Sequence, residues 1–323
     1  MTTTPAEAAK PEFVQLYHED REALRAELAA GLLCPQPAIA PKFLYDTLGS
    51  RLFEAITELD EYYPTRTEAA IMASHREQIA RAAGSGHTLV DLGAGNCAKA
   101  AALFDALRPQ RYVAVDISVE FLRAALGELQ HRHPALPMVG VGQDFSQRLH
   151  LPAAAGNGSR LMFYPGSSIG NFTPEQAATF LRQLRIESMA GGALLLGVDL
   201  VKPVAVLEAA YDDALGVTGA FNLNLLRNVN RVLGSDFDVA QWRHVALFNG
   251  AESRIEMHVE ARCDVCVRWP GGQREWRPGQ RLHTENSCKY TVEGFDALLR
   301  SAGFGDVRCW TDDKAWFAVF LAR

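Results

Sequence analysis

The chain has 323 residues, of which 48% are hydrophobic, so it can bury a core larger than that of a usual single domain. Its formal net charge of −6 and the lack of a long basic run argue against nucleic acid as a partner. No apolar run is as long as a membrane span, and the amino terminus lacks a basic segment leading into an apolar core, so we expect a cytoplasmic protein that does not bind membranes.

Helix and strand signals alternate from about residue 67 to the end of the chain. Thr65 and Glu68 have capping-box spacing and follow Pro64, which predicts a helix through Arg81. Strands are expected at 88–92, 111–115, 137–141, 161–165 and 193–199, and helices at 98–107, 118–132 with Ser118 as its cap, and 174–189 with Thr173 as its cap. Apolar runs at 304–310 and 316–323 predict a terminal hairpin. We therefore expect an α/β fold, with a Rossmann-like, doubly wound, mostly parallel sheet and a terminal antiparallel hairpin.

Two segments do not follow this alternation. Residues 1–66 precede the first strand and are helical and aromatic in character, and residues 201–289 intervene before the final helix and hairpin. Neither segment is long enough to form a stable domain by itself. We predict that they form one discontinuous α+β cap domain, 1–66 and 201–289, over a ligand-binding domain of 67–200 and 290–323. Open α/β sheets bind ligands at the carboxyl ends of their strands, so the cap is expected to lie there.

The strands 88–92 and 111–115 both end in groups suited to an adenosine-bearing ligand. Gly93 and Gly95 follow the first strand, and without side chains they let the backbone approach a ligand closely. Asp116 follows the second strand, where its carboxylate can accept hydrogen bonds from both ribose hydroxyls. These features alone fit both a nicotinamide dinucleotide and S-adenosylmethionine.

A carboxylate before the glycine turn favours S-adenosylmethionine. Asp91 lies two residues before Gly93, where a pyrophosphate would repel it and a cationic sulfonium with an ammonium group would attract it. Lys99 could bind the ligand's carboxylate, although a solvated lysine on the first turn of a helix is an equally good interpretation. We therefore expect S-adenosylmethionine as the cofactor.

The six cysteines do not have the density of a disulfide framework. Cys263 and Cys266 form the only C-x-x-C pair, and the alternating residues around them predict a strand with the two thiols on opposite sides. No second pair completes a zinc site. We interpret all six cysteines as reduced packing residues and expect no metal.

Six short motifs lie in the order and at the spacing of one known family. They occupy residues 41–46, 61–68, 166–174, 210–213, 254–257 and 284–290. From about residue 41 to its end, the chain resembles the histidine-specific N-alpha-methyltransferases of ergothioneine biosynthesis, which are S-adenosylmethionine-dependent class I methyltransferases. The resemblance implies that the α-amine of free L-histidine is methylated three times to give N-alpha,N-alpha,N-alpha-trimethylhistidine, which is hercynine.

The same resemblance implies roles for individual residues. The adenosylmethionine site would contain Gly93, Lys99, Asp116, Asp144 and Phe145, with Tyr45 near its amino-acid end. The amino and carboxylate groups of the substrate would contact Asn171 and Tyr211, with Thr218 helping through water. The imidazole pocket would be formed by Tyr62, Met257, Glu285 and Ser287.

Two positions depart from the family pattern. Tyr164 and Pro165 stand where some relatives have Phe and Leu, and Asn286 replaces a small apolar residue between the two imidazole contacts. If 284–288 is a strand, Glu285 and Ser287 share one face and Asn286 points away from the pocket.

The chemistry of these residues independently fits a free amino acid. Asn171 can donate to a carboxylate and accept from an amine, Tyr211 can donate to a carboxylate, and Glu285 can accept an imidazole N–H. Taken singly, each also fits a structural role, as a half-buried aromatic, a core filler, a solvated strand residue or a turn former. Their joint spacing favours the binding site.

Methyl transfer requires an amine that has lost its proton and lies in line with the methyl–sulfur bond, so positioning should supply most of the rate. We expect Tyr45 and Asn171 to orient the nitrogen and water to accept the proton, with no dedicated base. Two other functions stay open here. One is a methyltransferase of the same fold that acts on another amino acid or small amine, and the other is a non-catalytic adenosine-ligand sensor or binding subunit. We expect a monomer whose partner is a small molecule.

Overall fold

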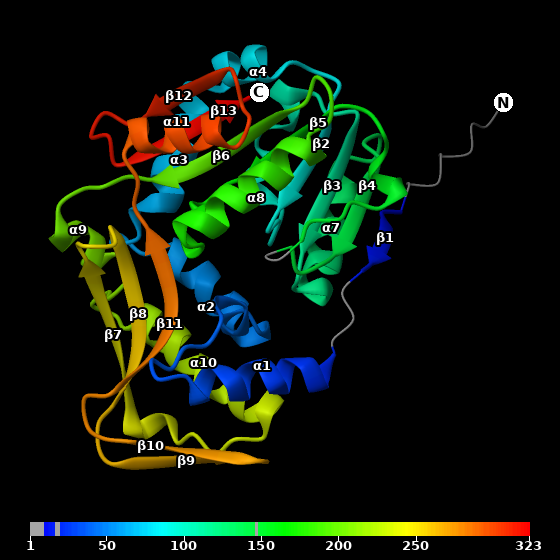
Figure 1. Cartoon of the computed structure of the whole chain (residues 1–323). Helices are drawn as coiled ribbons and strands as arrows, with labels where there is room; N and C mark the ends of the chain where they lie inside the picture. The colour runs from blue at the N-terminus through cyan, green and yellow to red at the C-terminus, as the bar shows by residue number, and fades with distance from the viewer. Residues whose placement is uncertain (1–9, 17–19, 146–147) are drawn as a thin grey trace.

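The structure, a computed structural model, describes residues 10–16, 20–145 and 148–323 (Figure 1). Its strands are β1 (Glu12–Gln15), β2 (Thr88–Leu92), β3 (Arg111–Asp116), β4 (Met138–Gly142), β5 (Arg160–Tyr164), β6 (Ala193–Asp199), β7 (Trp242–Asn249), β8 (Arg254–Ala261), β9 (Val265–Trp269), β10 (Gly272–Trp276), β11 (Arg281–Cys288), β12 (Val307–Thr311) and β13 (Phe317–Ala322). Its α-helices are α1 (Arg21–Leu33), α2 (Thr47–Thr57), α3 (Tyr63–Ser74), α4 (Arg76–Ala83), α5 (Ala98–Ala101), α6 (Phe104–Leu107), α7 (Val119–Arg132), α8 (Pro174–Glu187), α9 (Val204–Ala209), α10 (Val217–Leu233) and α11 (Val292–Ser301). Short 3-10 helices are η1 (Pro41–Leu44), η2 (Ala153–Ala155), η3 (Ser168–Asn171) and η4 (Val239–Gln241).

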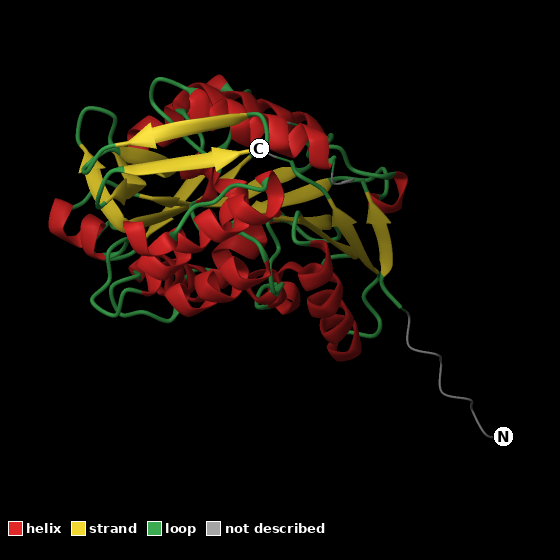
Figure 2. Cartoon of the chain, turned by 90° about the horizontal axis from the view of Figure 1, so that it is seen from below, coloured by secondary structure: helices red, strands yellow, loops and turns green. Residues whose placement is uncertain are grey.

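The main sheet has the strand order β1-β4-β3-β2-β5-β6-β13-β12. Strands β1 to β6 pair in parallel, and β13 is antiparallel to both β6 and β12. Figure 2 shows the two strands of this hairpin side by side, the second ending at the carboxyl terminus. The predicted fold class is confirmed. The chain order reverses between β2 and β5, and such a switch point opens a crevice at the carboxyl ends of the strands.

Strand β1 was not predicted, and it corrects the assignment of all of residues 1–66 to the cap. It pairs in parallel with β4 at the edge of the main sheet. Two glycines of β4 make room for its aromatic side chain: a Cβ atom added at Gly140 would lie 2.5 Å from the Phe13 ring. The guanidinium group of Arg123 then covers the same ring at 3.8 Å from the centroid. A four-residue edge strand held by such contacts has no periodic signal of its own.

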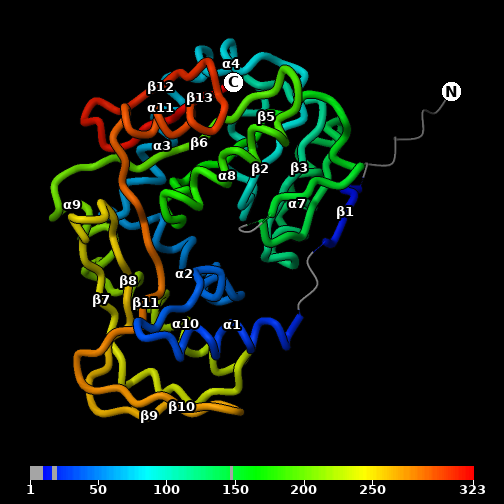
Figure 3. The backbone as a smooth tube through the Cα atoms, in the orientation of Figure 1, coloured from blue at the N-terminus to red at the C-terminus, as the bar shows by residue number. Residues whose placement is uncertain are grey.

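The second part of the molecule, here called the cap, consists of α1, α2, α10 and strands β7 to β11. Three of its strands form an antiparallel sheet in the order β11-β8-β7, and β9 pairs with β10. Apolar side chains from both predicted cap segments share one core, which includes Leu28, Phe43, Phe221, Trp242 and Val259. Figure 3 shows the chain passing between the main sheet and the cap along α2 to α3, β6 to α9 and β11 to α11.

The cap contacts the carboxyl ends of the parallel strands. After β3, the hydroxyl group of Ser118 donates to the backbone oxygen of Tyr45 at 3.4 Å. After β4, the carboxylate of Asp144 lies 3.6 Å from the ammonium group of Lys42. The ligand-binding end of the sheet is therefore also the end that the cap covers.

Several helices begin or end differently from prediction. Helix α3 starts at Tyr63, with Pro64 in its first turn and no side-chain cap, so Thr65 and Glu68 do not form the predicted capping box. It ends at Ser74, and α4 is a separate helix. The predicted helix 98–107 is likewise divided into α5 and α6. Ser118 occupies the N-cap position of α7 without a capping hydrogen bond.

Helix α8 has the predicted cap. Thr173 accepts a hydrogen bond from the backbone of Gln176, whose side chain accepts one from the backbone of Thr173. Pro174 follows at the first helical position, where its missing N–H costs nothing. This cap fixes the start of α8 directly after η3, which carries Asn171.

The cysteines are only partly packing residues. Cys97 and Cys288 are buried, whereas Cys34 and Cys263 are exposed, and Cys263 lies between β8 and β9 and not within a strand. Among the described residues, no group of three or more His, Cys, Asp or Glu side chains is arranged to hold a metal ion. Within the same residues, no helix combines the length and apolar character needed to cross a bilayer.

Candidate active site

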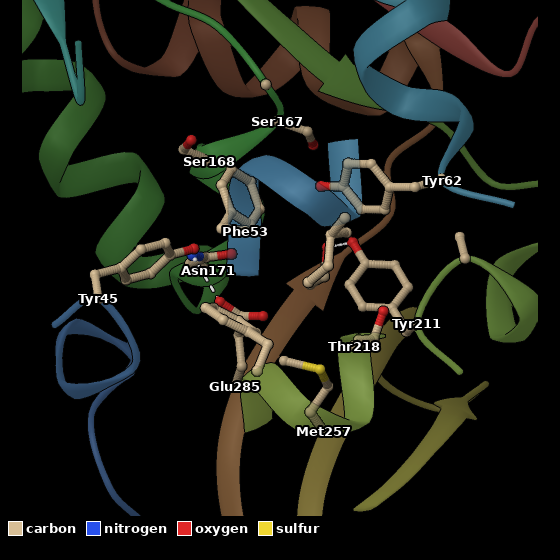
Figure 4. A pocket seen from close by; sticks show the side chains of 15 residues that line it. Tyr45, Phe53, Tyr62, Ser167, Ser168, Asn171, Tyr211, Thr218, Met257 and Glu285 are labelled. Carbon is tan, nitrogen blue, oxygen red and sulfur yellow. Dashed lines mark hydrogen bonds between the residues drawn. The ribbon is translucent and has the colours of Figure 1, made fainter. Parts of the chain in front are cut away.

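One pocket between the main sheet and the cap contains all the residues predicted to surround the substrate (Figure 4). Its predicted members are Tyr45, Tyr62, Asn171, Tyr211, Thr218, Met257, Glu285 and Ser287, and its other members are Phe53, Ile56, Gly166, Ser167, Ser168, Ala210 and Phe221. The sheet domain supplies the loop after β5, and the cap supplies the remaining walls. The pocket therefore forms only where the two parts meet.

Strand pairing in the cap places three polar or flexible side chains on the pocket face. Glu285 of β11 lies directly opposite Met257 of β8, and Ser287 follows two residues later on the same face. Asn286 points elsewhere, because its side-chain oxygen lies 2.9 Å from Nε2 of His283. The alternation expected for 284–288 is thus observed, and the unusual residue at 286 does not line the pocket.

A glycine brings Asn171 to Glu285. Helix η3 packs against β11 so closely that a Cβ atom at Gly170 would lie 2.9 Å from the backbone oxygen of Cys288. Across this contact, Nδ2 of Asn171 donates to Oε1 of Glu285 at 3.3 Å. Among the described residues, no hydrogen bond reaches the amide oxygen of Asn171, and this oxygen can accept one from a ligand N–H.

Tyr211 is fixed from two sides. Asp213, two residues later, accepts hydrogen bonds from the backbone of Val217 at 2.9 Å and of Thr218 at 2.7 Å, so it caps α10. On the other side, Nε2 of His244 lies 2.7 Å from the backbone oxygen of Tyr211. Asp213 and His244 thus hold the backbone on both sides of Tyr211, and the phenol of Tyr211 extends into the pocket.

Aromatic rings form the walls between these polar groups. The Tyr45 ring makes edge contacts with Phe53 and Phe221, at centroid distances of 5.7 and 5.5 Å. The Tyr62 ring meets Tyr211 in the same way at 6.2 Å. Burial raises the pKa of the Tyr45, Tyr62 and Tyr211 phenols, so all three hydroxyl groups are neutral near pH 7 and none is a base there.

Glu285 is the carboxyl group in the pocket wall. Its side chain is buried, and burial raises its pKa to about 7, while the charge of Lys289 acts in the opposite direction. Near neutral pH this group therefore exchanges between a form that only accepts hydrogen bonds and a form that can also donate one. Either form can pair with one nitrogen of an imidazole ring.

The residues expected at the cofactor surround an open cradle at the end of β2. Gly93 and Gly95 have φ values of 72° and 51°, and the atom nearest to a Cβ placed at Gly93 would be Cζ of Phe145, at 3.9 Å. The carboxylate of Asp116 accepts hydrogen bonds from the backbone of Gly95 at 2.9 Å and of Ser118 at 2.8 Å. It holds the glycine turn and keeps further lone pairs for a ribose, so the cradle fits an adenosine-bearing ligand.

Lys99 is paired and not simply solvated. Its ammonium group lies 2.7 Å from Oε2 of Glu68, a carboxylate that is 1% exposed and also accepts from the backbone of Gly166 at 2.7 Å. This pairing aims Lys99 at the loop after β5, on the side of the cradle nearest the pocket. Asp144 and Phe145 follow β4, and Phe145 closes the cradle beside Gly93.

Asp91 does not have the position that the argument from charge assumed. It is 2% exposed, and it accepts a hydrogen bond from the hydroxyl group of Tyr112 at 2.7 Å, below the glycine turn. Burial raises its pKa to about 7. A carboxyl group in this place does not offer a surface charge to a ligand's ammonium group, so the interpretation of Asp91 as an exposed partner of that group was wrong.

The sequence motifs did not identify every residue that lines the pocket. Ser167 and Ser168 lie within the motif at 166–174 and line the pocket, but the sequence predicted no role for them. A short helix directly after a strand of the parallel sheet is the signal that could have identified them. Phe53 and Phe221 lie on amphipathic helices, where an aromatic residue facing a pocket has the same pattern as one facing a core.

Comparison with known proteins gives one family. A family model described as S-adenosylmethionine-dependent, histidine-specific methyltransferase matches residues 24–323. A histidine N-alpha-methyltransferase of Mycolicibacterium smegmatis is 42% identical over 93% of this chain and 95% of that protein. A histidine N-alpha-methyltransferase of Mycobacterium tuberculosis is 41% identical over 93% of this chain and 94% of that protein. Ergothioneine biosynthesis protein 1 of Neurospora crassa is 32% identical over 87% of this chain and 32% of that protein.

Proposed function

The chain belongs to the family of S-adenosylmethionine-dependent, histidine-specific methyltransferases, and we propose that it transfers three methyl groups from S-adenosylmethionine to the α-amine of free L-histidine, giving hercynine. The observation that carries the proposal is the pocket, where a group complementary to each part of histidine lies within one set of walls. A site that only sensed an adenosine ligand would have no use for these additional groups.

The imidazole end is formed by the pocket face of β8 and β11. Glu285 and Ser287 supply two hydrogen-bonding side chains, and Met257 supplies an apolar, adaptable surface between them. A buried polar pair rejects a side chain without matching donors or acceptors, because its own groups would then be unpaired. This pair supports histidine over an apolar amino acid.

The amine and the carboxylate have partners on other elements. Asn171 donates to Glu285, so its amide oxygen is the atom available to accept an N–H from the amine. Tyr211 and Thr218 lie on the cap wall, where the phenol of Tyr211 can donate to the carboxylate. Tyr45 and Asn171 line the same pocket (Figure 4), where both can orient the nitrogen.

The residues of the cradle fit the cofactor of this family. Gly93, Gly95, Asp116, Phe145 and Lys99 would hold S-adenosylmethionine, with Asp144 at the end of β4. When bound, it supplies an electrophilic methyl carbon. The chain's own part is to hold the amine in line with that carbon and to keep the lone pair of the amine exposed.

None of the three tyrosine phenols in the pocket is a base at neutral pH, and Glu285 is assigned to the imidazole. The three tyrosine phenols are neutral, because burial raises the pKa of each. We therefore assign proton removal to water, with Asn171 and Tyr45 selecting the orientation in which the lone pair faces the methyl group. Repeated methylation would reuse the same contacts, after rotation about the bond between the α-carbon and the nitrogen.

We assign substrate binding to a cap domain and cofactor binding to the sheet domain, with the predicted boundaries changed only by the transfer of β1 to the sheet. We propose that the chain acts as a monomer. Both substrates are small metabolites of the cytoplasm, and we place the activity there.

Mass spectrometry of a reaction containing the protein, S-adenosylmethionine and the twenty amino acids tests this function. We expect histidine to gain the mass of one, then two and then three methyl groups. Methylation of a different amino acid would refute the histidine assignment and leave the reaction class intact. Binding of S-adenosylmethionine without methylation of any amino acid would refute the enzymatic assignment.

A further inference from the structure

Behind the pocket wall lies a buried lysine to which neither the motifs nor the proposed function gives a role. Lys289 follows β11 directly and is 3% exposed. Its ammonium group lies 2.8 Å from Oδ2 of Asp199, 3.0 Å from the hydroxyl oxygen of Tyr211 and 2.7 Å from Oγ of Ser287. The last two residues line the pocket, and Asp199 ends β6 of the main sheet.

The number of N–H donors on Lys289 determines the directions of these hydrogen bonds. A lysine ammonium has three N–H donors and no acceptor, so the three partners of Lys289 use all of them. The oxygens of Tyr211 and Ser287 must accept from Lys289, and they also lie 2.7 Å from each other. One hydroxyl group therefore donates to the other, and a single O–H remains to point at a ligand.

The carboxylate of Asp199 is shared by two lysine side chains. Asp199 forms ion pairs with Lys289 and with Lys202, whose ammonium lies 2.6 Å from Oδ1. Lys202 directs its remaining hydrogen bonds to the hydroxyl group of Tyr63 and to the backbone oxygen of Leu200. Two ammonium groups thus share one buried carboxylate, and that of Lys289 lies directly behind the hydroxyl groups of Tyr211 and Ser287, with Glu285 as a second acidic group that it interacts with. A substrate carboxylate in contact with the hydroxyl group of Tyr211 would be attracted by the ammonium group of Lys289.

We propose that Lys289 is a positioning and specificity-determining residue, which orients the two hydroxyl groups so that Ser287 donates to Tyr211 and the O–H of Tyr211 faces the ligand, and which thereby selects ligands that carry a carboxylate. It acts through those hydroxyl groups and through its charge, without touching the substrate. This inference rests on the proposed function, because it assigns the carboxylate of an amino acid to this side of the pocket.

Lys202 provides a matched control. It is 8% exposed, it is paired with the same carboxylate, and it lies three residues from Asp199. It forms no hydrogen bond with Tyr211 or Ser287 among the contacts of the described residues. Replacing either lysine by methionine leaves Asp199 with one lysine, so the two variants differ in their effect on the pocket hydroxyl groups and not in the loss of an ion pair.

The experiment compares three ligands by calorimetry: L-histidine, histamine, which lacks the carboxylate, and S-adenosylhomocysteine. For Lys289→Met we expect the Kd of histidine to rise about 10- to 100-fold, the effect of losing a hydrogen bond supported by a charge, with changes below about 3-fold for histamine and S-adenosylhomocysteine. For Lys202→Met we expect changes below about 3-fold for all three ligands. An equal loss for histidine and histamine, or an equal effect of the two substitutions, would overturn the proposal.

A double-mutant cycle tests whether Lys289 acts through Tyr211. The effects of Lys289→Met and Tyr211→Phe on the binding of histidine should not add, because the second change removes a hydroxyl group that the first leaves misoriented. Additive effects would show that the lysine acts elsewhere. Circular dichroism confirms folding, and Lys289→Gln, which keeps a side-chain donor without the charge, replaces the methionine variant if that variant does not fold.

Ligand binding by the wild-type protein distinguishes a failure of the proposed function from a failure of this inference. If the wild-type protein binds no histidine but does bind another amino acid, that amino acid and its decarboxylated amine replace histidine and histamine in the same comparison. If it binds neither histidine nor any other amino acid, the proposed function and this inference both fail. A preference of the wild-type protein for carboxylate-bearing ligands that survives Lys289→Met refutes the inference alone.

Discussion

The substitution Glu285→Ala tests whether the pocket recognises an imidazole ring. The carboxyl group is 7% exposed and makes one hydrogen bond to a neighbouring side chain, from Nδ2 of Asn171 at 3.3 Å. That bond is long, so most of the pairing capacity of this carboxyl group is available to a ligand. Its loss should affect a ligand with an N–H on its side chain much more than a ligand without one.

The structure gives the expected size of the effect of Glu285→Ala and the pH at which this effect should be measured. A hydrogen bond to a charged group contributes about 1.5–3 kcal/mol, which corresponds to roughly 10- to 150-fold in kcat/KM. Burial raises the pKa of Glu285 to about 7. At pH 8, about nine tenths of the groups are ionised, and the full effect of the charge should be seen.

The assay compares kcat/KM for histidine and for one aromatic amino acid without a ring N–H, such as phenylalanine, at pH 8. Glu285→Ala should reduce the value for histidine by the factor above and leave the value for phenylalanine within about 3-fold of the wild type. Tyr211→Phe is the matched control, because it removes a contact to the carboxylate that both amino acids share, and it should lower both values by a similar factor. An unchanged ratio between the two amino acids in Glu285→Ala would refute the assignment of this residue to the imidazole.

Three further predictions concern the cofactor, metals and pH. S-adenosylhomocysteine should raise the melting temperature and NAD should not, and a thermal shift with NAD alone would contradict the cofactor assignment. Asp116→Ala should weaken the binding of S-adenosylhomocysteine by on the order of 1.5–3 kcal/mol, because it removes the ribose acceptor and the support of the glycine turn. Activity should persist in excess EDTA, and Cys263→Ser should methylate at the normal rate, whereas loss of turnover that a divalent ion restores would show a metal site. Burial raises the pKa of Asp91 from 3.8 to about 7, so the folded state keeps a proton that the unfolded state loses above about pH 4, and this group destabilises the fold as the pH rises towards 7. Urea unfolding measures how far the free energy of unfolding falls from pH 5 to pH 8. This fall should be smaller in Asp91→Asn than in the wild type by about 2–3 kcal/mol. An equal fall in both proteins would place the pKa of Asp91 near its usual value.

The regular part of the fold could be predicted because it has local signals. The buried strands β2 to β6 are continuous apolar runs, and the cap of α8 at Thr173 is a short-range pattern. Strand β1 could not be predicted in this way, because its place in the sheet depends on the space that Gly140 leaves for Phe13, far along the chain. The start of α3 at Tyr63 similarly follows from tertiary packing, since no side chain caps it.

Prediction of the site succeeded where side chains alternate along a strand and failed where their partners are distant. Glu285 and Ser287 were placed on one face by period two, whereas Lys289 follows the end of β11 and lies behind the pocket wall, and the strand pattern did not identify it. The pairing of Lys99 with Glu68 and the burial of Asp91 under Tyr112 join positions 31 and 21 residues apart, and no local pattern shows either contact.

The contacts that close the pocket join parts of the chain that are synthesised far apart in time. Asn171 and Glu285 are 114 residues apart, and Tyr211 and Ser287 are 76 apart. Such contacts form late in folding, because the entropy of closing long loops opposes them until the local structure is in place. The pocket is therefore absent until β11 docks, near the carboxyl terminus. A ligand that bridges its walls stabilises the docking of the two parts, so amino-acid binding should raise the cooperativity of unfolding and not protect one half alone.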